Sequence, residues 1–183
     1  MKKYIPALLV IIGLVLFTSC KNEVRTDSGN TSDTDNKILQ QEDGTISLKL
    51  EKAECYHDMD NPKSNTAEWS ILVSKSGRFD VWLSSATTDT TNLKYENSVM
   101  LSFLENRLEK RPLCDKVFQN STDVTFPYFR ADSFMGSLYI QDTGLYNIQI
   151  ISEKIVPTNY RGNDTATFNS SKLLSVFLTP AIH

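Results

Sequence analysis

The sequence predicts an all-β domain, an antiparallel β-sandwich or jelly roll of about nine strands, behind a signal peptide and a disordered tether. Three observations predict this class. Apolar and polar residues alternate along much of the chain after Ile46, which is the spacing of half-buried strands. Turn-forming residues separate these runs. No amphipathic helix of three turns lies between them, which favours neighbouring antiparallel strands over a parallel sheet with crossover helices.

The first nineteen residues form a secretory signal. Lys2 and Lys3 precede a 13-residue apolar run from Ile5 to Phe17, and this order of basic and apolar residues is typical of such signals. The run is too short to cross a bilayer core of about 30 Å as a permanent helix. We therefore expect residues 1–19 to be removed before the domain folds.

Thr18 and Ser19 stand directly before Cys20. Small residues before a lone cysteine resemble the bacterial lipoprotein signal, although Phe17 replaces the commoner Leu. The resemblance implies cleavage before Cys20, a diacylglyceryl thioether on its sulfur and an acylated amine, and two or three acyl chains hold a domain stably on a membrane. We expect a lipid-anchored protein of the bacterial cell envelope, in the outer membrane, with surface exposure left open. An ordinary signal peptide with an incidental cysteine is the alternative.

A polar tether follows the cysteine. Residues 21–37 contain a single aliphatic residue, Val24, among Ser, Thr, Asp, Asn and Gly, a composition that cannot form a packed core. As a flexible coil these 17 residues span roughly 20 to 25 Å. We expect residues 20–40 to be the lipidated cysteine and tether, and residues 41–183 to be the sandwich.

The alternation gives the strands in order. The opening candidates are Ile46 to Leu50, Trp69 to Val73 and Phe79 to Leu83, and Gly77 and Gly144 stand before strands, where a glycine suits a tight turn. Ser102 to Arg111 is the one stretch with some helical character. The remaining candidate strands are Val99 to Phe103, Val117 to Gln119, Val124 to Phe126, Ser137 to Ile140, Leu145 to Ser152 and Leu173 to Leu178.

The order of these segments resembles galactose-binding-like β-sandwiches over roughly residues 45 to 181. The segments that carry the resemblance are Ile46 to Glu54, Ala67 to Val73, Gly77 to Leu83, Asp142 to Ile150 and Leu173 to Pro180. In that superfamily a strand containing Glu is followed by a strand with Trp and by a Gly-aromatic-x-Val strand. Many members are carbohydrate-binding modules, so the resemblance implies a glycan ligand, although fold alone does not establish function.

Strand parity separates the two tryptophans. Trp69 shares parity with the apolar Ile71 and Val73, which predicts a core position. Trp82 shares parity with Arg78 and Asp80, so we expect these three side chains on one polar face. A flat ring beside directed polar groups is the chemistry that sugars require. The alternative is a Trp covered by a loop or a partner strand.

Two further clusters could border such a site. Tyr128, Arg130 and Asp132 lie close together in a stretch without clean alternation, which we interpret as a loop; packing of a long crossover is the alternative. Tyr56 lies in a third cluster beside His57, in a loop that could border the same end. The sequence thus predicts stacking by Trp82 and Tyr128, with polar contacts from their neighbours.

Charge and motifs restrict the function. The formal net charge is -3 and becomes -5 once Lys2 and Lys3 are removed, so nucleic acid is a poor partner. The sequence contains no Gly-x-Ser-x-Gly elbow, no His-Glu-x-x-His and no phosphate-binding Gly loop. We therefore expect a non-catalytic protein. The alternatives are a protein-interaction or structural lipoprotein that docks on an envelope lipoprotein or transporter, and a small glycan-active hydrolase using two carboxylates.

Metal and disulfide sites remain open. The superfamily resemblance implies a calcium site between opening-strand carboxylates, which Glu51 and Glu54 match, and an acid on the last strand, which is missing here. We therefore expect no cofactor, with calcium as the alternative. Cys55 and Cys114 form an even pair in an oxidising compartment, compatible with a disulfide or with two separate buried thiols.

Overall fold

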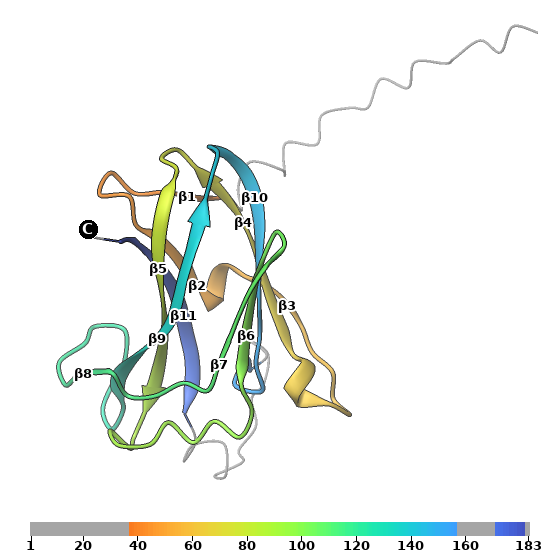
Figure 1. The fold of residues 1–183 in the computed structure, drawn as a ribbon. Coiled ribbons are helices and arrows are strands. Elements are labelled where there is room, and N and C mark those ends of the chain that lie inside the picture. Colours follow the sequence, from red (N-terminus) through yellow and green to blue (C-terminus); the bar gives the residue numbers. More distant parts are fainter. Residues whose placement is uncertain (1–36, 157–170, 182–183) are drawn as a thin grey trace, which may run out of the picture. The chain divides into compact units, whose positions relative to one another are not determined.

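A computed structural model describes residues 37–156 and 171–181, so the expected cleavage site, Cys20 and most of the tether lie outside the described residues. Eleven strands form two sheets, as the sequence predicts for an all-β sandwich (Figure 1). Among the described residues, no helix has the length and apolarity to span a membrane.

The six-stranded sheet has the order β1-β4-β10-β6-β7, and β3 also pairs with β4. Its β1–β4 pair is parallel, an exception to the expected antiparallel pattern. β1 belongs to this sheet and begins at Ile38, three residues before residue 41, where the sequence analysis places the start of the sandwich. The strands are β1 (Ile38–Leu39), β3 (Glu54–Tyr56), β4 (Thr66–Val73), β6 (Val99–Phe103), β7 (Asn106–Lys110) and β10 (Gly144–Ile151).

The five-stranded sheet has the order β2-β11-β5-β9-β8, and all its pairs are antiparallel. Two short 3-10 helices, η1 (Leu50–Lys52) and η2 (Pro62–Ser64), flank β3 along the chain. The strands of this sheet are β2 (Ile46–Lys49), β5 (Gly77–Thr87), β8 (Lys116–Phe118), β9 (Phe129–Ile140) and β11 (Lys172–Pro180).

The apolar side chains that alternate along the strands of both sheets point into one core. Trp69 is 2% exposed, which confirms its expected core position. Its Nε1 donates a hydrogen bond to the Lys49 carbonyl at 2.9 Å, linking β4 of one sheet to β2 of the other. Burial of each such large apolar side chain contributes about 1.5–3 kcal/mol. The fully buried side chains include Ile46, Leu48, Ile71, Leu83, Leu101, Phe103, Ile140, Ile148, Ile150 and Leu178.

One side of the sandwich closes where β7 meets β9. Gly136 lies in β9 at a register irregularity opposite Val81, with φ +136°. A Cβ at Gly136 would stand 3.2 Å from Leu108 Cδ2, so the glycine lets β7 approach. Lys110 Nζ also donates to the Phe134 carbonyl at 2.7 Å. A β-bulge commonly re-aims a strand in this way.

Three local expectations were wrong. Ser102 to Arg111 forms the β6–β7 hairpin, with Leu104 in the turn at φ 52°, instead of a helix. Val124 to Phe126 is irregular, whereas Phe129 and the residues after it form β9 instead of a loop. Of the three, only β9 is formed by pairing with a distant strand, β5, whereas β6 pairs with the adjacent β7.

Candidate functional site

Five of the seven candidate ligand residues share the outer face of the five-stranded sheet. Arg78, Asp80 and Trp82 project from β5 on the side opposite its buried Phe79, Val81 and Leu83. The same face of β9 carries the other two, Arg130 and Asp132, whose backbone partners are Ala86 and Ser84 of β5. The parity argument for β5 therefore placed its three side chains on a common face.

These five residues do not form one site. Arg78 pairs with Tyr139 at one end of β5, and Arg130 pairs with Ala86 near the other end. Ala86 lies eight residues after Arg78 on β5, which corresponds to about 26 Å of strand. Arg78 and Arg130 therefore cannot contact the same monosaccharide.

The two tyrosines separate as well. Tyr128 precedes β9 directly and lines a small cavity of about 240 Å³ together with Lys172, whose Nζ lies 6.0 Å from the ring centroid. Tyr56 lies on β3, an element of the other sheet. Its hydroxyl donates to Glu54 at 3.3 Å, and the charge of Glu54 raises the pKa of Tyr56. The structure therefore does not bring Tyr56 to the candidate face.

Trp82 is half-buried and already has stacking partners. Lys116 Nζ of β8 lies 3.7 Å from the Trp82 ring centroid, a cation–π contact. Phe134 packs against the same indole with ring centroids 5.2 Å apart and planes tilted by 52°. A sugar could stack on the face that Lys116 covers only if the lysine moved aside.

Asp80 is similarly engaged. Ser137 Oγ donates to its carboxylate at 2.6 Å, and Thr179 Oγ1 donates to its backbone carbonyl at 3.4 Å. Ser137, Asp80 and Thr179 are cross-strand partners on β9, β5 and β11. This polar row ties three strands together.

Arg130 is the most constrained charged residue of the face. Its Nε and Nη2 donate to the two carboxylate oxygens of Asp132 at 2.9 and 2.8 Å, and its Nη1 donates to Asp123 at 2.9 Å. The guanidinium carbon lies 4.9 Å from the Phe118 ring centroid and 5.0 Å from that of Phe177. The hydrogen bond to Asp132 is the main cause of the raised pKa of Arg130. Such a planar, two-pronged pairing holds the side chain in one orientation.

A groove of about 500 Å³ lies beside this guanidinium, between β2, β11 and the Asp123 loop. A second hollow of about 500 Å³ shares Asp123 and Arg130, so their ion pair forms a wall between the two. Among the residues that the structure describes, the Lys49 and Glu51 side chains make no hydrogen bond or ion pair. The groove residues used below are Lys49, Glu51, Asp123, Arg130, Leu174 and Phe177.

Ser84 is a further side chain without a described hydrogen-bond partner near the groove. It is 1% exposed, and its cross-strand partners are Asp132 on β9 and the groove residue Ser175 on β11. Its hydroxyl has no hydrogen-bond partner in the described part of the chain. Buried hydroxyls are normally paired, so this part of the sheet has spare hydrogen-bonding capacity.

The sequence argument did not assign Lys49 or Phe177 to a site, and it named Glu51 only as a carboxylate of the calcium alternative. Parity on β2 could have placed Lys49 outward, opposite the buried Ile46 and Leu48. Phe177 lies between the buried Val176 and Leu178, so its outward position could also have been found. Only the strand order β2-β11-β5-β9 shows that Lys49 and Phe177 lie on the same sheet as Arg130.

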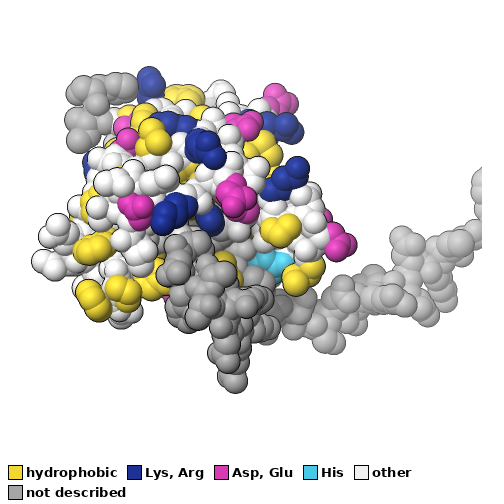
Figure 2. Space-filling model, turned by 90° about the horizontal axis from the view of Figure 1, so that it is seen from below, with side chains coloured by type: hydrophobic (Ala, Val, Ile, Leu, Met, Phe, Trp, Pro, Cys, Tyr) yellow, Lys and Arg dark blue, Asp and Glu magenta, His cyan; other side chains and the backbone are white. Residues whose placement is uncertain are grey.

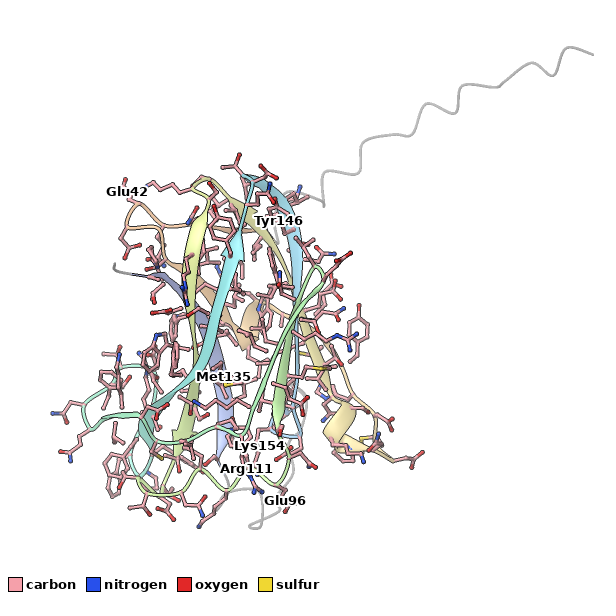
Figure 3. All side chains as sticks on the ribbon, viewed as in Figure 1. Glu42, Glu96, Arg111, Met135, Tyr146 and Lys154 are labelled. Atoms are coloured by element: carbon pink, nitrogen blue, oxygen red, sulfur yellow. The ribbon has the colours of Figure 1, made fainter. Side chains whose placement is uncertain are left out.

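Another hollow, of about 580 Å³, lies among the long loops at one end of the sandwich. Arg111 donates to the carbonyls of Tyr95 and Glu96 at 3.0 and 2.7 Å, while Glu153 accepts the Glu96 amide at 2.8 Å. Figure 3 shows Glu96, Arg111 and Lys154 at this end. Figure 2, viewed from the same end, shows acidic and basic side chains interspersed with separate hydrophobic ones. In its described contacts, Arg111 holds the loop that contains Tyr95 and Glu96 in place.

The two cysteines are free thiols in the structure, so the disulfide is not formed. Cys55 lies on β3 opposite Ala67, and Cys114 lies in the segment between β7 and β8. Burial raises the pKa of both thiols, and Asp89 and Asp115 raise that of Cys114 further. Within residues 37–156 and 171–181, no group of three or more His, Cys, Asp or Glu side chains could hold a metal ion.

No protein-family model matches the chain, and no curated protein matches it. Solved structures do resemble it. An α-L-fucosidase from Vibrio sp. strain EJY3 matches with a TM-score of 0.62 and 17% identity, over 81% of this chain and 24% of the fucosidase. A Podospora anserina GH26-CBM35 β-(1,4)-mannanase matches with a TM-score of 0.46 and 12% identity, over 77% of this chain and 28% of that one.

The likeness to the fucosidase shows the fold alone, because the identity is only 17%. The chain spans about a quarter of the length of these two proteins. The mannanase likeness is too weak to carry an argument. The β-sandwich is thus an architecture that this chain shares with one part of a larger carbohydrate-active protein.

Proposed function

We propose that the protein is a cell-envelope lipoprotein, acylated at Cys20, whose galactose-binding-like sandwich binds a glycan without transforming it. The signal-like N-terminus and the small residues before Cys20 support the anchor. The sandwich fold, which part of an α-L-fucosidase also has, supports a glycan as the class of ligand.

The groove beside Arg130 is the observation that carries the proposal. A sugar needs an apolar surface against its C–H groups and polar groups in fixed directions around its hydroxyls. Phe177 and Leu174 supply the apolar wall of the groove, and Lys49 and Glu51 supply a donor and an acceptor. Arg130, held by Asp123 and Asp132, keeps one wall in place.

This geometry changes the roles given to the candidate residues. Arg130 is held by two hydrogen bonds to Asp132 and one to Asp123, so we assign it and Asp132 to positioning the wall of the groove. The sugar contacts are assigned to Lys49 and Glu51. Tyr128 lines the adjoining small cavity. Trp82 contributes a separate aromatic surface beneath Lys116.

Binding without turnover fits the carboxylates of the groove. A glycosidase needs two carboxyl groups placed on either side of the bond it cleaves, one of them a proton donor. Asp123 and Asp132 are both ion-paired with Arg130 at 2.9 and 2.8 Å. This pairing leaves Glu51 as the unpaired carboxylate that lines the groove.

A glycan-array screen of the mature protein, followed by calorimetry on each hit and a search for cleaved product, tests the proposal. We expect dissociation constants of roughly 10 µM to 1 mM, so the array must present its sugars multivalently. Lys49→Ala and Glu51→Gln should each weaken binding at least about tenfold. Tyr139→Ala is the matched control, because Tyr139 is 63% exposed on the same face but at its other end.

Two results would contradict this assignment. A blank array would remove the glycan ligand, and product formation would favour the hydrolase alternative. A folded Trp82→Ala, Tyr128→Ala double variant separates the two surfaces. If it loses binding while Lys49→Ala does not, the ligand lies on the tryptophan surface instead of the groove.

The lipid anchor needs a separate test. We expect the mature protein to incorporate labelled fatty acid in bacterial cells and Cys20→Ala to incorporate none. Mass spectrometry of the purified N-terminal peptide should give the mass of an acylated Cys20. An unmodified N-terminus at any other residue would support an ordinary signal peptide.

A further inference from the structure

Four exposed leucines lie at one end of the six-stranded sheet. Leu39, Leu72 and Leu145 are direct cross-strand neighbours on β1, β4 and β10, and they are 63%, 41% and 54% exposed. Each stands beside a buried or core-facing residue of its own strand, so the three project together from the outer face. Leu104, 68% exposed, lies in the β6–β7 turn, which points toward the same end of the sheet and is about level with Asn147 of β10.

The outer face away from this end is polar. Ser70 Oγ donates to Asn147 at 3.0 Å, and Gln149 Nε2 donates to Glu68 at 2.7 Å, so β4 and β10 are joined there by side-chain hydrogen bonds. The leucines therefore form a local apolar area with a polar border. Contiguous exposed apolar areas of this kind mark contact with a partner or a membrane.

The path of the chain identifies the occupant. Leu39 stands two residues after Lys37, the first described residue, and nineteen residues after Cys20. If Cys20 is acylated, a polar segment of the composition of residues 21–37 is expected to have a root-mean-square span of roughly 20 to 25 Å. A sheet end that begins with Leu39 therefore stays, on average, within this distance of the lipid headgroups.

We propose that this leucine end rests on the lipid surface that holds Cys20; this inference depends on the acylation in the proposed function. A bilayer surface accepts separate leucines without requiring a complementary shape, as amphipathic surface-binding elements illustrate. A stable interface with a second copy would need about 20–30 residues on each side. Four leucines bordered by polar side chains fall well short of that number.

The contact would orient the glycan groove away from the membrane. Leu72 lies at the end of β4, next to the turn that leads into Gly77 of β5, whereas Arg130 pairs near the far end of β5. Figure 3 shows Tyr146, the neighbour of Leu145, at the end of the sandwich opposite Arg111 and Glu96. Lipid contact and ligand binding therefore use opposite ends of the domain.

Brominated lipids, which quench tryptophan on contact, test this orientation. The full protein, purified with its anchor, is reconstituted in phosphatidylcholine vesicles with and without brominated acyl chains. The reporter is Leu145→Trp, and the matched control is Phe118→Trp, at a 41% exposed position on β8. The native Trp69 and Trp82 contribute the same background emission in the reporter and control variants. We expect the added emission of Leu145→Trp to be quenched at least about threefold more strongly.

Flotation of the vesicles separates this inference from the proposed function. If the protein floats but both reporters are quenched equally, the anchor stands and the leucine contact is overturned. If the protein does not float, both are overturned. Emission of Leu145→Trp that responds to the protein-to-lipid ratio and not to bromine would indicate a second copy on the leucines, which also overturns the proposal. Leu39→Trp replaces Leu145→Trp if the latter does not fold.

Discussion

The outer faces of the two sheets are built from the same alternation but have different surroundings. On the six-stranded sheet, outward side chains such as Ser70 pair across neighbouring strands and stay accessible. On the five-stranded sheet, Ser84 and Ala86 also have outward parity, yet they are 1% and 6% exposed. The segment between β7 and β9 lies against this face, since the loop around Asp123 lines a small cavity with Ala86 and Lys116 of β8 lies over Trp82 (Figure 1).

This difference shows where a binding site can form on a sandwich. An open pleated face offers rows of side chains but no enclosure, whereas a segment folded over a face creates grooves with walls. Small-molecule sites are concave and combine apolar walls with a few directed polar groups. The covered face has both features around Arg130, and the open face has the exposed leucines.

The largest expected effect comes from removing the charge that joins the covering segment to the sheet. Arg130→Ala leaves Asp132, which is 6% exposed, without its ion-pair partner. Loss of one partner of a buried pair costs several kcal/mol, and partial exposure of Arg130 reduces this to about 2–3 kcal/mol. Urea unfolding measures the change. Arg78→Ala, at an exposed position on the same face, should change stability by no more than about 0.5 kcal/mol; equal losses would contradict the role given to Arg130.

A smaller difference between a variant and its control is expected where the two sheets meet at β7 and β9. Gly136→Ala places a methyl group 3.2 Å from Leu108 at a φ of +136°, whereas Gly77→Ala, at φ +146°, meets nothing within 4 Å. Both variants carry backbone strain of about 1–3 kcal/mol. Crowding against Leu108 should make Gly136→Ala the less stable by about a further 1 kcal/mol. Thermal unfolding of the two proteins gives the difference, and the same Tm in both would show that β7 does not press on Gly136.

The contact between Lys116 and Trp82 should contribute about 0.5–1 kcal/mol. Lys116→Ala removes the ammonium group 3.7 Å from the ring centroid and uncovers one face of the indole. Acrylamide quenching of fluorescence should increase, with buried Trp69 as the constant component. Lys63→Ala, in η2, serves as the control. Unchanged quenching would mean that Lys116 does not shield Trp82 in solution.

The smallest expected effect concerns the two thiols, Cys55 on the six-stranded sheet and Cys114 in the segment between β7 and β8. Burial alone raises the pKa of Cys55, whereas Asp89 and Asp115 also raise that of Cys114. Salt screens charges, so added NaCl should lower the pKa of Cys114 and increase its thiolate fraction at pH 8. Its alkylation, followed by peptide mass spectrometry, should accelerate modestly while that of Cys55 stays constant. Recovery of a Cys55–Cys114 disulfide from oxidised cells would contradict the free thiols.

Local patterns predicted strands better than they predicted the gaps between them. Trp69 and Trp82 were assigned to opposite faces by parity, and Trp69 is in the core. The hairpin from Ser102 to Arg111 was not predicted from the sequence. Its turn at Leu104 lacks glycine or proline, and β7 is an edge strand with mostly polar residues. Its pairing with β6 is what makes it a strand.

The candidate site was predicted only in part. Parity on β5 brought Arg78, Asp80 and Trp82 to one face, but it could not show that Arg78 lies about 26 Å along the strand from the partner of Arg130. Tyr56 was grouped with the others because nothing in the local sequence shows that β3 joins the opposite sheet.

The sequence by itself determined the all-β class and the inward or outward direction of most strand residues, since both follow from a two-residue period that every strand carries locally. The tertiary structure decided which outward residues share a site. The groove joins Lys49 of β2, Arg130 of β9 and Phe177 of β11, and strand order and register, set by packing between distant segments, are what bring these three side chains together.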